Sequence, residues 1–185
     1  MNDATQSALR AAIAVRRLDG RPPELRELQR VLEEAPDYAL RVTGAPPGDA
    51  DAQSVFTALP AGKTFADKFV FAIDRDRELV GCADVIRGYP HPATAMLGLF
   101  LLSEKHQRRG IGCHAYCLLE EIVRSWGSCE RMRIGVVRSN AQVIPFWTRF
   151  GFTPTGETRP YRHGAVASEV VVFEKRLLPE RLNAT

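Results

Sequence analysis

The sequence lacks an apolar run that could cross a bilayer, since such a helix needs about 20 consecutive apolar residues. A secretion signal is not expected either, because the short apolar stretch at residues 11–15 is closed by Arg16 and Arg17. There are only four cysteines, and without a leader these indicate reduced thiols rather than a disulfide framework. A cytoplasmic protein without a membrane partner is therefore expected.

A strong charge of either sign is missing too. The 185 residues carry 25 Lys and Arg against 22 Asp and Glu, which gives a formal net charge of +3. Nucleic-acid binding needs a concentrated basic face, so no nucleic-acid partner is expected. Repeats and low-complexity tracts are absent from the sequence. We predict a single domain over residues 11–178, with a flexible N-terminus at 1–10 and a C-terminal tail at 179–185.

The hydrophobic pattern predicts one mixed α/β domain with the order β-α-α-β-β-β-α-β-α-β-β. Strands are expected at residues 11–18, 69–73, 79–86, 95–102 and 132–137, followed after Gly151 by a final pair that ends at 170–173. Helices are expected at residues 22–34, 49–59, 110–126 and 140–150, with Pro36 closing the first. The almost wholly apolar run 95–102 is typical of a central strand buried on both faces.

The segment 107–112, with the sequence Gln-Arg-Arg-Gly-Ile-Gly, stands between a hydrophobic strand and a long amphipathic helix. Glycines let a backbone approach a ligand closely, and the free amides and dipole of a helix N-terminus attract anions. Arg108 and Arg109 add cationic donors. The segment therefore predicts a phosphate or pyrophosphate cradle. The structural alternative is a glycine-containing helix start with two solvated arginines.

Residues 110–115 also fit the dinucleotide fingerprint G-x-G-x-x-A. Two spacings argue against it. Seven residues separate Leu102 from Gly110, and the acidic residue expected about 20 positions on, Glu130, precedes its strand instead of ending it. A nicotinamide oxidoreductase is kept as the weaker alternative.

Cys113, His114 and Cys117 resemble part of a metal site, since the two thiols lie one helical turn apart. A second pair at zinc-like spacing is missing from the sequence. We therefore expect no metal.

A second block supports a family assignment. It consists of Asn140, then Phe146 and Trp147, then the Phe-Gly-Phe triplet 150–152. Taken with the segment 107–112, it resembles the Q/R-x-x-G-x-G/A and N-x(5)-F-Y-x(3)-G-F motifs of the GNAT superfamily of N-acetyltransferases. The resemblance is strongest over residues 68–176. It implies a mixed, mostly antiparallel sheet with a splayed parallel strand pair, flanked by helices.

The resemblance also implies acetyl-CoA as co-substrate. The splayed pair would be 95–102 and 132–137, with the pantetheine arm paired to the first strand as an added strand. The cofactor-binding residues that the resemblance implies are Phe100, Leu101, Leu102, Gln107, Arg108, Arg109, Gly110, Ile111, Gly112, Cys113, Asn140, Phe146 and Trp147. The backbone N–H of Leu102 would polarise the thioester carbonyl and stabilise the oxyanion.

The catalytic pair departs from the pattern of the ribosomal-protein N-terminal acetyltransferases. Their base is a Glu five residues before the Asn and their acid a Tyr seven after it, and these positions are Gly135 and Trp147 here. Glycine accepts no proton, and an indole N–H only donates.

Asp84 and Tyr161 are therefore the predicted replacements, with a structural ion pair as the alternative for Asp84. Tyr161 and His163 are expected in the loop between the last two strands, and His91 in a turn is a further candidate.

The predicted function is N-acetylation of an amine by direct attack on acetyl-CoA in a ternary complex. A small-molecule acceptor is favoured over a protein, because the peptide-directed pair is missing. The alternative is a CoA-binding sensor or interaction module with little catalysis. A homodimer is expected only by analogy with relatives of the superfamily.

Overall fold

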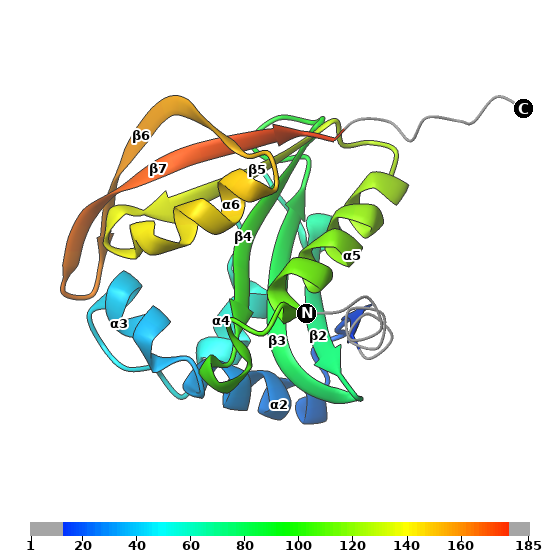
Figure 1. Ribbon diagram of the computed structural model, residues 1–185, viewed down its shortest axis with the longest axis vertical. Coiled ribbons are helices and arrows are strands. Elements are labelled where there is room, and N and C mark those ends of the chain that lie inside the picture. The colour runs from blue at the N-terminus through cyan, green and yellow to red at the C-terminus, as the bar shows by residue number, and fades with distance from the viewer. Residues whose placement is uncertain (1–12, 178–185) are drawn as a thin grey trace, which may run out of the picture.

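The computed structural model describes residues 13–177 as one seven-stranded sheet in the order β1-β2-β3-β4-β5-β7-β6 (Figure 1). The strands are β1 Ile13–Arg17, β2 Lys68–Arg75, β3 Glu78–Arg87, β4 Thr94–Leu102, β5 Arg131–Val137, β6 Thr153–His163 and β7 Val166–Arg176. All neighbouring strands are antiparallel except β4 and β5, which confirms the mixed sheet and excludes a doubly wound dinucleotide fold. The predicted terminal segments 1–10 and 179–185 lie outside the described residues.

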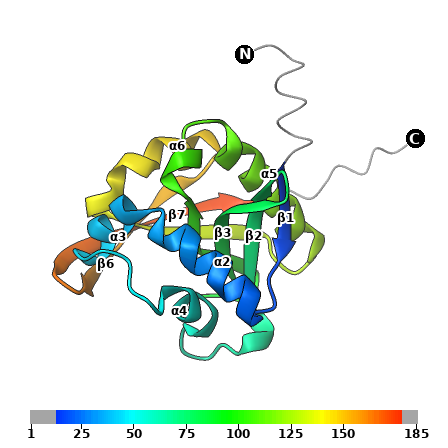
Figure 2. The same ribbon diagram turned by 90° about the horizontal axis from the view of Figure 1, so that it is seen from below.

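Helices cover both faces of the sheet. They are α2 Pro22–Glu33, α3 Pro36–Thr43, α4 Asp51–Thr57, α5 Ile111–Ser125 and α6 Ile144–Arg149, with short 3-10 turns η1 Phe65–Asp67, η2 Glu104–His106 and η3 Arg138–Val143. Figure 2 shows α2 and α4 on one side of the sheet and α5 and α6 on the other. Within residues 13–177, none of the helices is long and apolar enough to cross a membrane.

Hydrophobic side chains pack on both faces of the central strands, because side chains alternate along a strand. On one face, Phe71 and Val85 pack with Tyr116 of α5. On the other, Val70 and Cys82 pack with α2. Since both faces of the central strands are covered, their sequences are nearly continuous apolar runs.

Helix α3 was not predicted, because Pro36 was assigned only as the end of the preceding helix. Pro36 lies in the first turn of α3, where its missing N–H costs nothing, and Gly44 ends the helix with a φ of 75°. The helix is fixed to the tip of the β6–β7 hairpin, where the N–H of Ala165 donates to the carbonyl of Thr43 at 3.1 Å. Tyr161 lies within β6 rather than in the loop that was expected, and His163 ends that strand.

Strands β4 and β5 separate along their length. They pair from Thr94 opposite Arg131 as far as Leu97 opposite Ile134 and then diverge, which confirms the splayed parallel pair. In the β3–β4 ladder, Asp84 faces Leu99 and Val85 faces Leu97, so Gly98 is the extra residue of a bulge. The expectation that residues 95–102 are buried on both faces is wrong at residues 98–100, which are exposed or half-buried, whereas Leu101 and Leu102 are buried again.

Candidate functional site

A cleft of about 800 Å³ opens where β4 and β5 diverge. Its walls come from α3, β4, the loop before α5, β5, η3 and α6. Most of the predicted cofactor-binding residues line it, namely Phe100, Leu101, Leu102, Gln107, Arg108, Gly110, Gly112, Cys113, Asn140, Phe146 and Trp147. The two sequence blocks therefore meet at one cavity.

Two predicted cofactor residues do not line the cleft. The side chain of Ile111 is fully buried in the core cluster that includes Val80 and Leu102, so it supports the helix start from beneath. Arg109 is exposed to solvent and lies outside the cleft lining. Ile111 can therefore offer only its backbone to a bound anion.

The edge of β4 presents backbone groups to the gap. The N–H of Ser103 donates to the carbonyl of Val80 on β3 at 2.9 Å. Successive N–H groups in a strand point in opposite directions, so those of Leu102 and Phe100 point away from β3, toward the space left by β5. The side-chain amide of Gln107 donates to the carbonyl of Leu102 at 2.9 Å. An extended ligand can therefore pair with this edge as an added strand.

The loop before α5 turns sharply enough to aim backbone amides at the cleft. Arg108 and Gly110 have φ angles of 56° and 83°, in the left-handed region that favours glycine. Gly110 is the N-cap of α5, a helix of 15 residues whose first N–H groups have no partners within the helix. These amides, with the side chain of Arg108, form a site suited to a phosphate or pyrophosphate group.

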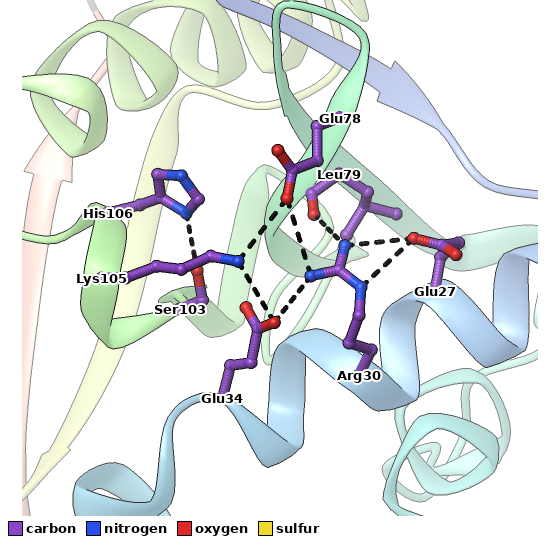
Figure 3. Close-up of polar contacts among 8 residues, drawn as sticks. All are labelled: Glu27, Arg30, Glu34, Glu78, Leu79, Ser103, Lys105 and His106. Atoms are coloured by element: carbon purple, nitrogen blue, oxygen red, sulfur yellow. Dashed lines mark hydrogen bonds and ion pairs between the residues drawn. The ribbon is translucent and has the colours of Figure 1, made fainter.

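The segment that leads into this loop is anchored to α2 and β3 by polar contacts. Figure 3 shows them among Glu27, Arg30, Glu34, Glu78, Leu79, Ser103, Lys105 and His106. Arg30 donates to Glu34 at 3.0 Å, and Lys105 reaches the same carboxylate at 3.3 Å. The hydroxyl of Ser103 lies 2.8 Å from Nδ1 of His106, whose pKa is lowered by burial and by Lys105. A neutral His106 can accept a hydrogen bond from that hydroxyl, which holds η2 at the start of the loop.

Asp84 forms a nearly buried ion pair with Lys68. Nζ of Lys68 lies 2.9 Å from both carboxylate oxygens and 2.8 Å from the carbonyl of Ala58. The side chains of Lys68 and Asp84 are 3% and 16% exposed. Burial raises the pKa of Asp84, and the charge of Lys68 opposes that rise. The ion pair weighed as the alternative for Asp84 is thus present, and Asp84 lies outside the cleft lining.

Tyr161 connects the β6–β7 hairpin to α3. Its hydroxyl donates to the carbonyl of Val42 at 2.9 Å, and burial raises its pKa. Tyr38 of α3 lines the cleft, and its pKa is raised by burial and then by Tyr161. His91 and His163 are exposed and lie outside the cleft lining.

Gly135 and Trp147, which stand where the ribosomal-protein N-terminal acetyltransferases have their Glu and Tyr, have different surroundings. Gly135 is exposed in the cleft, and a Cβ on it would lie 2.7 Å from Cγ1 of Val170. Trp147 is 7% exposed and packs edge-on against Tyr116, with ring centroids 5.6 Å apart. The indole therefore forms part of the aromatic floor beneath the cleft.

The sequence did not identify the cleft residues of α3, which are Asp37, Tyr38, Arg41 and Val42. Nε of Arg41 donates to Oδ1 of Asn140 at 3.2 Å, so α3 contacts η3, another wall of the cleft. A proline in the first turn and a glycine at the end would have signalled this helix. Its contacts join residues far apart in the sequence, and no local sequence pattern predicts them.

All four cysteines are free thiols. Among residues 13–177, groups of three or more His, Cys, Asp or Glu side chains that could hold a metal ion are absent.

The chain is similar to known acetyltransferases in sequence pattern and in fold. The sequence model of the Acetyltransferase (GNAT) family matches residues 28–152. An acetyltransferase from Thermus thermophilus is 23% identical, with a TM-score of 0.65 over 89% of this chain and 97% of its own. None of the curated protein sequences matches the chain.

Two further solved structures carry more specific names. A spermidine N-acetyltransferase from Vibrio cholerae, in complex with CoA and spermine, is 12% identical, with a TM-score of 0.69 over 90% of this chain and 96% of its own. The ribosomal-protein-S18-alanine N-acetyltransferase from Escherichia coli is 14% identical, with a TM-score of 0.65 over 94% and 99%. At these identities the likeness concerns the fold.

Proposed function

Because the chain belongs to the Acetyltransferase (GNAT) family, we propose that it uses acetyl-CoA to N-acetylate the amine of a small molecule, by direct attack in a ternary complex. The observation that carries the proposal is the divergence of β4 and β5 beyond Leu97 and Ile134, beside the loop before α5. It provides a backbone edge for an extended arm and an anion site at one end of that edge. Bound acetyl-CoA would supply the thioester that the amine attacks.

The residues of the cleft fit the parts of the coenzyme. The N–H groups at the start of α5, with Arg108, would bind the pyrophosphate, and the side chains of Asn140, Phe146 and Trp147 would contact the arm. The edge of β4 offers two N–H groups, those of Leu102 and Phe100, about 6.6 Å apart along the strand.

Leu102 lies beside the loop, since its carbonyl accepts from Gln107, whereas Phe100 lies nearer the point where the strands part. We therefore revise the oxyanion donor expected at Leu102. In this proposal Leu102 pairs with the pantetheine arm, and the N–H of Phe100 points at the thioester carbonyl, where it would stabilise developing negative charge.

The enclosure of the acceptor end favours a small molecule over an extended peptide. Two hydrogen bonds hold helix α3. Arg41 donates to Asn140 on one side, and the hydroxyl of Tyr161 donates to the carbonyl of Val42 on the other. Both contacts fix α3 beside the cleft, which limits the room for a polypeptide acceptor. Tyr161 is accordingly assigned a positioning role between the hairpin and α3.

Acetyl-CoA is expected to raise the melting temperature of the wild type and of Gly112→Ala, but not of Gly112→Glu. A Cβ at Gly112 would lie 3.5 Å from Cδ1 of Leu102, an ordinary contact, so alanine fits, whereas glutamate places a carboxylate where the phosphates bind. Ligand at about 100 times its dissociation constant should stabilise the protein by roughly 2.7 kcal/mol. Differential scanning fluorimetry with acetyl-CoA, CoA and NAD(P)H measures this effect.

An assay of the free CoA released from acetyl-CoA in the presence of a panel of amines completes the test. Stabilisation by NAD(P)H and not by CoA compounds would contradict the proposal. Binding of acetyl-CoA without turnover on any amine would instead favour the CoA-binding sensor.

A further inference from the structure

Helix α3 presents one face to the cleft. Its lining residues are Asp37, Tyr38, Arg41 and Val42, which are related by steps of three or four positions and so share one side of the helix. The ring of Tyr38 packs against the core cluster that contains Leu28 of α2, whereas α5 and α6 contribute to the cluster on the other face of the sheet. The cleft-facing side chains of α3 therefore belong to the α2 side of the sheet.

Arg41 is held in place mainly by neutral groups. Its Nε donates to Oδ1 of Asn140 at 3.2 Å, and the amide oxygen of Gln142, when turned to accept, lies 2.9 Å from the same nitrogen. The acid paired with it is Asp37, at 3.4 Å, whose side chain is 65% exposed, and such exposed pairs are weak. A guanidinium has five N–H groups. Arg41 can therefore donate to a further oxygen, and its charge is offset only by an exposed carboxylate.

Tyr38 adds a neutral donor to the same face of α3. Within residues 13–177 its hydroxyl has no hydrogen-bond partner. Burial raises the pKa of Tyr38, and the nearby hydroxyl of Tyr161 adds to that rise, so the phenol stays protonated at neutral pH. The face of α3 thus combines a fixed cation with a hydroxyl that can donate one hydrogen bond.

The other cations of the cleft lie on the side proposed for the coenzyme. Among the described lining residues, the charged side chains are Asp37, Arg41, Arg108 and Arg149. Arg108 stands in the loop assigned to the pyrophosphate, and Arg149 lies in α6, on the α5 side of the sheet (Figure 2). An anionic group bound at Arg41 would therefore belong to the acceptor. A guanidinium matches the geometry of a carboxylate, to which it can donate two parallel hydrogen bonds.

We propose that the acceptor is a small amine that also carries a carboxylate, and that Arg41, together with the hydroxyl of Tyr38, binds this carboxylate and determines specificity. This inference rests on the proposed function. With its carboxylate on the α2 side of the cleft, the acceptor can direct its amine toward the edge of β4, where the thioester would lie.

Three matched pairs of amines test the substrate class. Glycine, 3-aminopropionate and 4-aminobutyrate place one, two or three methylenes between the amine and the carboxylate, and their primary amides replace the carboxylate with a neutral group of similar shape. We expect kcat/KM for the carboxylate of the best pair to exceed that for its amide by about tenfold or more. A nearby carboxylate raises the pKa of an amine and lowers its neutral fraction, so this preference is not an effect of basicity.

Arg41→Gln removes the cation and keeps a polar side chain. We expect kcat/KM for the preferred carboxylate to fall about tenfold or more, while kcat/KM for its amide and KM for acetyl-CoA change less than about twofold. Arg41→Lys keeps the charge and should retain part of the preference. Tyr38→Phe should lower the preference by about threefold to tenfold. A merely structural role of Arg41 would instead lower both members of the pair alike.

Arg138→Gln is the matched control, because Arg138 lies in η3 close to Asn140 but is 59% exposed, pairs with Glu169 and lies outside the cleft lining. It should leave the ratio within each pair unchanged. Should Arg41→Gln not fold, the ratios for the wild type and Tyr38→Phe decide alone.

Four results would overturn the inference. They are acetylation of the amides as fast as of the carboxylates, faster acetylation of 2-aminoethyl phosphate than of any carboxylate, an equal loss for both members of the pair in Arg41→Gln, and binding of acetyl-CoA without acetylation of any amine in the panel. Failure of acetyl-CoA to bind the wild type would instead overturn the proposed function.

Discussion

Replacement of Lys68 by methionine is expected to lower the free energy of unfolding by about 3 kcal/mol, because it leaves the carboxylate of Asp84 without its cation. Removal of one partner from a buried pair costs about 3–5 kcal/mol. The lower end applies here because Asp84 is 16% exposed, whereas Lys68 is 3% exposed. Methionine keeps the length and most of the apolar stem of lysine, so the change isolates the charge.

Urea unfolding of three variants measures this effect. Lys68→Met combined with Asp84→Leu removes both charges and should recover most of the lost stability. Arg138→Met breaks a pair with Glu169 whose side chains are 59% and 51% exposed, and it should cost less than about 1 kcal/mol. A Lys68→Met variant no less stable than Arg138→Met would contradict the assignment of a buried pair.

The stability difference between Lys68→Met and the wild type should shrink as the pH falls. Burial raises the pKa of Asp84 in the folded protein, against about 3.9 in the unfolded chain, so the folded state takes up its proton at the higher pH. Protonation of Asp84 therefore stabilises the folded protein at a pH below the pKa of the unfolded chain. This stabilisation is lost as the pH rises through the pKa of Asp84 in the folded protein. Without the opposing charge of Lys68, the raised pKa should rise further. Urea unfolding from pH 7 to about 4 checks this, and a constant difference between the two proteins would contradict it.

The residues proposed to bind the coenzyme could be predicted from the sequence because their signals are local. The glycines and arginines of 107–112 stand at a helix start, and the apolar runs at 95–102 and 132–137 mark two central strands. The parallel pairing of these strands and their separation were inferred from the family resemblance. The strands do pair in parallel and separate after Leu97 and Ile134, which confirms the inference. Local chemistry thus predicted the anion site, and the resemblance supplied the splay.

The acceptor half depends on contacts between residues far apart in sequence. Arg41 meets Asn140 across 99 positions, and Tyr161 meets Val42 across 119. The closeness of Gly98 to Asp84 results from a bulge in one ladder, which a sequence pattern does not specify. The strand containing Asp84 could be predicted, whereas its ion pair with Lys68 required the register.

Replacement of Phe152 by alanine is expected to lower the free energy of unfolding by about 3–5 kcal/mol. Phe152 belongs to the second sequence block that marks the family, yet it is 1% exposed and does not line the cleft. Its ring lies 5.4 Å from that of Trp147 and 6.0 Å from that of Tyr116, measured between centroids. Removal of the ring leaves a cavity beneath α5 and α6, and urea unfolding measures the loss.

Phe65→Ala is the matched control for this change, because the ring of Phe65 is 64% exposed and its removal should cost within about 0.5 kcal/mol. Under conditions where both variants are folded, acetyl-CoA should bind each as it binds the wild type. A loss of coenzyme binding in folded Phe152→Ala would show that the ring shapes the cleft, and a stability loss below about 1.5 kcal/mol would contradict the cavity argument. The expected combination separates two roles within one motif: Phe146 and Trp147 line the cleft, whereas Phe152 packs against Trp147 from the core.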